Sequence, residues 1–295
     1  MASYLWLLPF RLLLIRLEKA EVVTNCDHPS QPSLLRGCYP SIAQSGQQPN
    51  RGRARHRVQP KPNLSGAIWR KPPIVRGRIV RNVCASLKRT YGRPRLGNPY
   101  DPLDDLVYII LSNKTGPQTA HRTYERLRAR FPNWEQIVKV PSSQIRSILR
   151  PAGLSSVKSR QLRAALRSIN HRLGRYDLRA LRRKPEEEIE EFLTSLPGVS
   201  EKVAKCVMMY TLGGQVLPVD VHVHRIASRL GWTSRKRADQ CHEELELLVP
   251  PRKRHAFHVD CVLHGRRICR PHEPLCRSCC IKGACEFYKK NRRDV

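Results

Sequence analysis

Apolar side chains recur at the spacing of an α-helix along most of the chain after about residue 76. Two stretches show it clearly, with apolar positions on one helix face at Ala120, Tyr124, Leu127 and Phe131, and again at Leu162, Leu166, Ile169 and Leu173. Gly174 follows the second stretch, at a position where a glycine commonly ends a helix. Alternating apolar and polar residues, the pattern of a half-buried strand, are nearly absent. The sequence therefore predicts an all-α fold.

A third apolar stripe leads into a tight turn. It comprises Ile189, Phe192, Leu193 and Leu196, on a helix that Pro185 and three glutamates would open. The chain then passes through Pro197-Gly198-Val199-Ser200, and a second helix is expected from about Glu201. Such a turn leaves backbone N–H groups at a helix start, where a phosphate can bind. An ordinary turn between two packed helices explains the same residues.

Two candidate chemical groups follow this turn. Lys202 lies in the first turn of the second helix, and Asp220 comes later, in Val219-Asp220-Val221-His222. Lysines at helix starts are commonly solvated, and an aspartate in such a place is commonly a helix N-cap. If the turn binds a phosphate, however, a nucleic-acid strand would run past the Lys202 amine.

The charge balance favours an anionic partner. The chain carries 55 Lys and Arg against 24 Asp and Glu, a formal net charge of +31. Such an excess is typical of proteins that bind nucleic acid, where neutralised phosphates release counterions. An acidic membrane surface, or a basic tail that only solubilises the protein, would also fit this charge.

The first 75 residues predict a disordered basic tail. Residues 20 to about 75 are rich in Pro, Ser, Gln, Asn and Arg and show no sustained periodicity. The apolar stretch Tyr4 to Leu17 contains Pro9 and Arg11 and is too short to span a bilayer. A targeting segment and a wrongly assigned start both remain open.

Five of the eleven cysteines lie between Cys269 and Cys285. The pattern C-x6-C-x2-C-x5-C sets apart four of them: Cys269, Cys276, Cys279 and Cys285. An odd total with one dense group indicates a metal site rather than a disulfide framework. Zinc is the default ion for four thiolates, although only one C-x2-C pair is present. Cys280 is interpreted as a non-ligand.

The stretch from Leu196 to Arg225 resembles the endonuclease III branch of the helix-hairpin-helix DNA glycosylases. That branch carries a hairpin ending in lysine, followed by an aspartate in a V-D-x-H context. The resemblance extends from roughly Asn98 to Cys285. It implies a six-helix barrel over 104–214, with the hairpin at about 186–213, and a second helical domain formed by 76–103 and 215–295.

The resemblance also implies the chemistry. A damaged base would be flipped out of the duplex, and Lys202 would attack the sugar C1′ while Asp220 takes a proton or stabilises positive charge. DNA contacts are expected from the hairpin residues, the loop residues and the histidine after the aspartate: Gly198, Val199, Ser200, Asn113, Lys114, Leu154 and His222. The cysteine spacing matches the branch's [4Fe-4S] loop. That cluster would be structural, with Arg266, Arg267, Arg270 and Arg277 around it.

Four departures from the family pattern put the substrate in doubt. Asn113-Lys114 stands where the family has a glutamine that fills the gap left by the flipped base. Ser200 replaces a glycine and would be strained at positive φ, and Val221 stands where threonine is common. His272 and Glu273 occupy a loop that is usually more basic.

The expected function is DNA base excision repair by a bifunctional glycosylase and abasic-site lyase acting on oxidised pyrimidines. The expected partner is double-stranded DNA containing a damaged base or abasic site, bound by a monomer without membrane association, inside the cell. The alternatives are a monofunctional adenine or mismatch glycosylase and a non-catalytic DNA-binding homologue. The chain ends ten residues after Cys285, which leaves no room for the extra recognition domain of adenine-removing relatives.

Overall fold

The computed structural model describes residues 64–92 and 95–291, and within these ranges it contains helices and no strand. This confirms the all-α prediction. The twelve α-helices are α1 (Pro73–Tyr91), α2 (Pro102–Ser112), α3 (Pro117–Arg130), α4 (Trp134–Lys139), α5 (Ser142–Leu149), α6 (Ser155–Leu173), α7 (Glu186–Thr194), α8 (Glu201–Val207), α9 (Val221–Arg229), α10 (His242–Leu248), α11 (Pro251–Arg267) and α12 (Glu286–Lys290).

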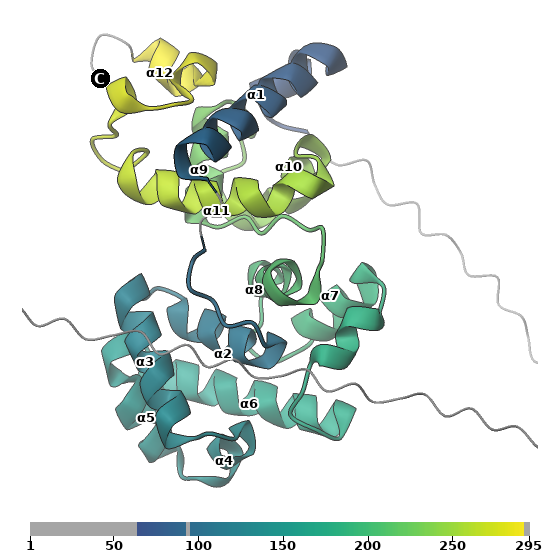
Figure 1. Cartoon of the computed structure of the whole chain (residues 1–295), viewed down its shortest axis with the longest axis vertical. Helices are drawn as coiled ribbons and strands as arrows, with labels where there is room; N and C mark the ends of the chain where they lie inside the picture. The colour runs from purple at the N-terminus through teal and green to yellow at the C-terminus, as the bar shows by residue number, and fades with distance from the viewer. Residues whose placement is uncertain (1–63, 93–94, 292–295) are drawn as a thin grey trace, which may run out of the picture. The chain divides into compact units, whose positions relative to one another are not determined.

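Shorter helical turns connect several of these helices (Figure 1). They are η1 (Ala67–Arg70), η2 (Arg150–Ala152), η3 (Arg179–Arg183), η4 (Met208–Leu212), η5 (Ala238–Gln240), η6 (Cys276–Ser278) and η7 (Lys282–Ala284). Of these, η4 is a π-helical turn that continues α8 directly. Such turns interrupt the regular hydrogen-bond ladder and are frequent at functional sites.

The predicted apolar stripes are buried. Leu127 of α3, Leu166 of α6 and Leu193 of α7 are each 1% exposed or less. Gly174 ends α6 in the left-handed region at φ 68°, and its N–H donates to the Asn170 carbonyl. Since a glycine has no Cβ to clash in that region, it is suited to this helix end.

The first hydrophobic core is formed by residues from the helices α2 through α8 and from the turn η4. Its centre is α2, whose residues from Leu106 to Leu111 are all buried, as expected of a helix that is apolar on every face. The helices α3, α6 and α8 pack against α2, and α5 packs against both α3 and α6. These helices are drawn in dark teal to green in Figure 1.

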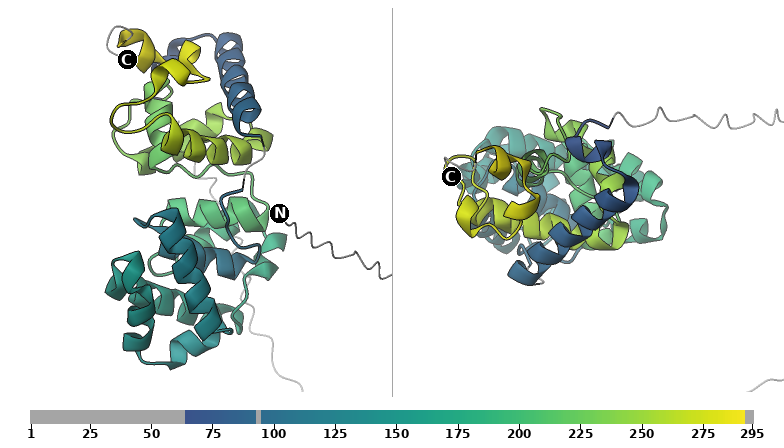
Figure 2. Two further views of the ribbon diagram at one scale, coloured as in Figure 1. Left: turned by 60° about the vertical axis from the view of Figure 1, so that its left-hand side comes forward. Right: turned by 90° about the horizontal axis from the view of Figure 1, so that it is seen from above.

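A second core brings together both ends of the described chain. Helix α1 packs on α11, and α11 packs on α9, as Figures 1 and 2 both show. At its centre the rings of Trp232 and Phe257 stack with their centroids 5.5 Å apart. Ile68 near the start and Ile281 near the end both belong to this core.

The prediction of a disordered tail up to residue 75 is wrong for residues 64–75. Ile68 is 3% exposed, and α1 begins at Pro73. The buried carboxylate of Glu244 accepts hydrogen bonds from the Ser65 hydroxyl and the Gly66 N–H. A buried carboxylate needs such donors, and this segment supplies them. Residues 1–63, the rest of the predicted tail, lie outside the described residues.

The described residues, 64–92 and 95–291, all belong to one compact unit. The division of this unit into a barrel domain and a cysteine-containing domain therefore stays a prediction, although two cores are present. In the described ranges 64–92 and 95–291, no helix combines the length and the apolar character needed to cross a bilayer.

Candidate active site

A groove of about 1830 Å³, including the open solvent at its mouth, is lined by residues from both cores. Six of the residues singled out from the sequence line it: Asn113, Lys114, Ser200, Lys202, Asp220 and His222. The structure thus brings together side chains that lie more than 100 positions apart in the chain. Leu154, Gly198 and Val199 are not among its lining residues.

Lys202 is the second residue of α8 and is half-buried at the groove. Cys206 lies one helical turn further along and lines the same groove. Burial raises the pKa of Cys206 to about 11, and the charge of Lys202 opposes that rise. In the described structure no direct ion pair joins Lys202 to Asp220, although each lines the groove and each acts on the other electrostatically.

Asp220 is the N-cap of α9. Its Oδ1 accepts hydrogen bonds from the N–H groups of His222, at 2.9 Å, and Val223, at 2.8 Å. The N-cap interpretation of this residue is therefore confirmed, and it fixes the carboxylate at the wall of the groove. Burial disfavours the ionised form, but His258, the Val223 N–H, His222 and Lys202 together lower the pKa of Asp220 below its ordinary value. The side chain is thus an anion at neutral pH.

Asp105 is a second acid near the groove, and our sequence analysis did not single it out. It is fully buried on α2, and its Oδ1 accepts a 2.6 Å hydrogen bond from the Asn98 amide. Its Oδ2 is buried without a hydrogen-bond partner. Burial raises the pKa of Asp105 to about 8, against the opposing effects of Asn98 and Lys202. The available signal was a pair of aspartates, Asp104 and Asp105, in the otherwise apolar stretch from Leu103 to Leu111.

Aromatic and histidine rings form another wall of the groove. Tyr210, in the π-helical turn η4, makes edge contacts with His255 and His258 at centroid distances of 5.8 Å and 5.9 Å. The Nδ1 of His258 lies 2.8 Å from the Pro218 carbonyl oxygen. Since a carbonyl oxygen only accepts hydrogen bonds, Nδ1 is protonated and donates. Burial lowers the pKa of His258 despite the nearby Asp220, so its Nε2 is left as an acceptor.

The hairpin between α7 and α8 turns at Gly198, which has a φ of +80°. A Cβ at this position would lie 2.5 Å from Cγ of Gln161, so glycine is required for both conformation and space. Ser200 has an extended backbone, with φ −84° and ψ 165°. The strain considered for a serine at that position is therefore absent.

Val199 was predicted to contact DNA, but its side chain is buried. Its side chain is 6% exposed and belongs to the first core, and its N–H donates to the Leu196 carbonyl. The prediction that the turn leaves its amides free is therefore wrong for Val199, because an i to i+3 bond closes the turn. For Gly198 and Ser200, DNA contact stays a prediction.

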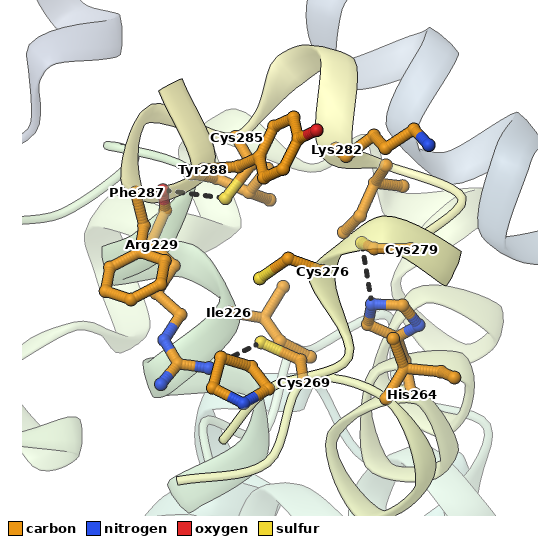
Figure 3. A pocket seen from close by; sticks show the side chains of 14 residues that line it. Ile226, Arg229, His264, Cys269, Cys276, Cys279, Lys282, Cys285, Phe287 and Tyr288 are labelled. Carbon is orange, nitrogen blue, oxygen red and sulfur yellow. Dashed lines mark hydrogen bonds between the residues drawn. The ribbon is translucent and has the colours of Figure 1, made fainter. Parts of the chain in front are cut away.

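The four patterned cysteines line one pocket, shown in Figure 3. The guanidinium of Arg229 donates to Sγ of Cys269 at 3.1 Å, and Nε2 of His264 lies 3.4 Å from Sγ of Cys279. All nine cysteines within the described residues are free thiols. Cys280 is exposed and does not line the pocket, as its interpretation as a non-ligand requires.

The four thiols surround a pocket whose other walls include Ile226 and Ile281. Soft sulfur donors in such a shell, with an N–H donor to one sulfur, fit an iron–sulfur cluster. As placed, no three His, Cys, Asp or Glu side chains of the described residues lie close enough to hold one metal ion. The bound group therefore stays a prediction.

Two arginines of α9 that our sequence analysis did not single out lie at this pocket. Arg225 donates to the Cys269 carbonyl at 2.8 Å, and Arg229 lines the pocket. Of the four predicted arginines, Arg266 lines the groove. For Arg267, Arg270 and Arg277, a place around the cluster stays a prediction.

Comparison with known proteins decides the family. Residues 107–251 match the HhH-GPD superfamily base excision DNA repair proteins. The chain belongs to this superfamily. It is 29% identical over 197 residues to the Endonuclease III of Thermotoga maritima, an alignment that covers 67% of this chain and 88% of the relative. It is 26% identical over 194 residues to the thymine/uracil-DNA glycosylase of Methanothermobacter thermautotrophicus, covering 64% of this chain and 84% of the relative.

A solved structure supports the fold of this HhH-GPD protein. The Endonuclease III chain of a non-covalent DNA complex superposes with a TM-score of 0.65 at 21% identity, covering 74% of this chain and 99% of that one. The matched family region contains Lys202 and Asp220 and ends before Cys269. The superfamily match therefore includes most of the residues that line the groove, whereas the four patterned cysteines lie beyond it.

In this HhH-GPD protein, two loops near the groove have left-handed backbone at non-glycine residues. Lys114 has a φ of 54°, and Leu154 has a φ of 51°. Leu154 is 55% exposed, so the alternative interpretation of it as a buried loop residue is wrong. The structure presents its apolar side chain to solvent.

Proposed function

We propose that the protein is a bifunctional DNA glycosylase and abasic-site lyase that acts on oxidised pyrimidines in double-stranded DNA. The observation that carries the proposal is the placement of Lys202 and Asp220 on one groove large enough for an everted nucleotide. An amine and a carboxylate at such a site supply a nucleophile and a proton acceptor. The protein would act as a monomer, inside the cell and on DNA.

The reaction follows from the amine of Lys202. In its neutral form, the nitrogen lone pair attacks C1′ of the everted sugar, and the bond from C1′ to the base breaks as the base leaves with the electron pair and gains a proton. Ring opening and loss of a proton give a Schiff base between Lys202 and the sugar. Removal of a C2′ proton then expels the 3′ phosphate, and hydrolysis of the imine frees the lysine.

Asp220 serves this reaction from a fixed position. Its N-cap hydrogen bonds engage Oδ1 with the backbone of α9. Because its pKa is lowered, the carboxylate is ionised at neutral pH and can accept the proton that the lysine amine releases. It also stabilises the positive charge that develops at the sugar as the base departs.

The DNA contacts are assigned to the rim of the groove. Asn113 and Lys114 would fill the space left by the everted nucleotide, and Leu154 would wedge into the opposite strand. Gly198, Ser200 and His222 would contact the backbone of the damaged strand. The net charge of +31 would strengthen all of these contacts through counterion release.

We assign a [4Fe-4S] cluster to Cys269, Cys276, Cys279 and Cys285. When bound, it would crosslink the segment after α11, which contains all four cysteines, and take no part in base removal. Arg229 would orient Cys269 through its 3.1 Å hydrogen bond. Purified protein should contain iron and acid-labile sulfide in equal amounts, and stoichiometric zinc without sulfide would contradict the assignment.

The function is tested on a panel of duplexes that each carry one modified base. The proposal predicts base release together with strand cleavage at oxidised pyrimidines, with both lost in Lys202→Ala. Base release at a mismatched thymine or adenine without strand cleavage would favour a monofunctional mismatch glycosylase. DNA binding with neither activity would favour a non-catalytic homologue.

A further inference from the structure

Lys158 of α6 is a buried cation with no acidic partner among the described residues. It is 3% exposed, and its ammonium makes three hydrogen bonds, all to uncharged oxygens. They run to the Leu111 carbonyl at 2.7 Å, the Ala152 carbonyl at 2.9 Å and the Thr115 hydroxyl at 2.6 Å. Burial of a charge is unfavourable unless its donors are satisfied, and here every proton of the ammonium has an acceptor.

The three acceptors belong to two neighbouring loops, and the first of these lines the groove through Asn113, Lys114 and Thr115. The Leu111 carbonyl lies at the end of α2, just before Asn113 and Lys114, and Thr115 follows them. The Ala152 carbonyl ends η2, two residues before Leu154. The hydroxyl of Thr115 also donates to the Ala152 carbonyl at 2.7 Å, which closes the network between the two loops.

The electrostatics of this arrangement favour a cation. The last carbonyls of a helix lack partners within the helix and carry its negative end, and here the ends of α2 and η2 converge on one ammonium. Burial lowers the pKa of Lys158 to about 8. The amine therefore keeps its proton in neutral solution, and with it all three donors.

The same two loops contain strained backbone. Within the described residues, three non-glycine residues have a positive φ: Lys114, Leu154 and Glu273. Two of these lie within two residues of an acceptor of Lys158. A left-handed conformation is unfavourable for lysine and leucine and persists only where the surroundings hold it.

We propose that Lys158 is a positioning residue that holds the Asn113–Lys114 loop and the Leu154 loop together as a single DNA-penetrating unit. This inference rests on the proposed function. In this role Lys158 does not touch DNA. It keeps the two loops in register so that they enter the duplex together, and its loss would affect the eversion of a stacked nucleotide more than the chemistry that follows.

The test is Lys158→Met, which keeps an unbranched side chain, one atom shorter, and removes the three donors. Its matched control is Arg160→Met, which removes one exposed positive charge from the same helix. Each variant is assayed at saturating enzyme on one lesion in two settings: fully paired, and opposite a gap where the lesion is already unstacked. The inference predicts a loss of about tenfold or more for Lys158→Met on the paired lesion and less than about threefold on the unstacked one.

A spectroscopic measurement separates positioning from general destabilisation. With 2-aminopurine beside the lesion, Lys158→Met should show a smaller fluorescence increase on binding than the wild type, and Arg160→Met should match the wild type. Equal losses of activity on both substrates, or no loss on either, would overturn the inference.

Thr115→Val provides a second variant in case Lys158→Met does not fold. It removes the hydroxyl that accepts a hydrogen bond from Lys158 and donates one to the Ala152 carbonyl, and it leaves the lysine in place. The same preference for the unstacked lesion is expected, and an unchanged ratio between substrates would count against the network. If the wild type neither releases the base nor cleaves the strand, the proposed function fails. If the wild type is active but each variant loses the same fraction of activity on both substrates, only the role of Lys158 is contradicted.

Discussion

The side-chain amide of Asn98 donates a 2.6 Å hydrogen bond to Oδ1 of Asp105, beside the groove that contains Lys202. This bond satisfies one oxygen of a carboxyl group whose other oxygen is buried without a hydrogen-bond partner. Burial raises the pKa of Asp105 from 3.8 to about 8. The native protein therefore binds this proton well above the pH at which the unfolded chain releases it.

The pH dependence of stability should reveal this proton. Between about pH 4 and pH 8 the native state holds a proton that the unfolded state lacks, so the stability from this group is present at low pH and is lost as the pH rises through 8. Asp105→Asn should flatten the fall in melting temperature over this range. Glu135→Gln, at an exposed surface pair, is the control and should leave the slope unchanged. An unaltered slope in Asp105→Asn would contradict the raised pKa.

Replacement of Asp220 by asparagine separates its two roles. The amide oxygen can still accept the N–H groups of His222 and Val223, so α9 should keep its cap and the melting temperature should change little. The negative charge is lost, and we expect base release and strand cleavage to fall by about 10²- to 10⁴-fold. Single-turnover rates measure the effect. Rates within threefold of the wild type would show that Asp220 only caps the helix.

The cysteine assignment is tested with two adjacent residues. Cys279→Ser removes a thiol that lines the pocket, whereas Cys280→Ser changes an exposed thiol outside it. Cys279→Ser should lose iron and sulfide and lower the melting temperature by about 5 °C or more, because the segment after α11 loses its crosslink. Cys280→Ser should keep both elements. Equal iron contents in the two variants would contradict the ligand set.

Gly198 should resist substitution for two independent reasons. An alanine there would have a φ of +80° and a Cβ 2.5 Å from Gln161, so Gly198→Ala should lower the free energy of unfolding by about 1–3 kcal/mol. Gly77, inside α1, faces only the side chain of Arg81, and Gly77→Ala should be neutral or stabilising. Urea denaturation compares the two, and an equally stable Gly198→Ala would refute the tight hairpin.

The helices were predictable from the sequence because their signal is local. The stripes through Leu127, Leu166 and Leu193 repeat within a few residues, and each proved buried. Lys202 and Asp220 were found through motifs near each other in the chain. Both line the groove, and their catalytic roles stay a prediction.

Features that depend on distant partners were missed. Ser65 is ordered because it binds Glu244, 179 residues away in the sequence. The environments of Asp105 and Lys158 likewise arise where separate segments meet, and their sequence neighbours do not show which groups surround them. The arginine beside Cys269 comes from α9 for the same reason.

The central claim is that the amine of Lys202 forms a covalent bond with the sugar of an everted nucleotide. Borohydride reduction of the protein bound to abasic-site DNA, followed by peptide mapping of the adduct by mass spectrometry, tests it most directly. We predict one trapped adduct, at Lys202, that is absent from Lys202→Ala while DNA binding persists. No adduct, or an adduct at another amine, would contradict the account.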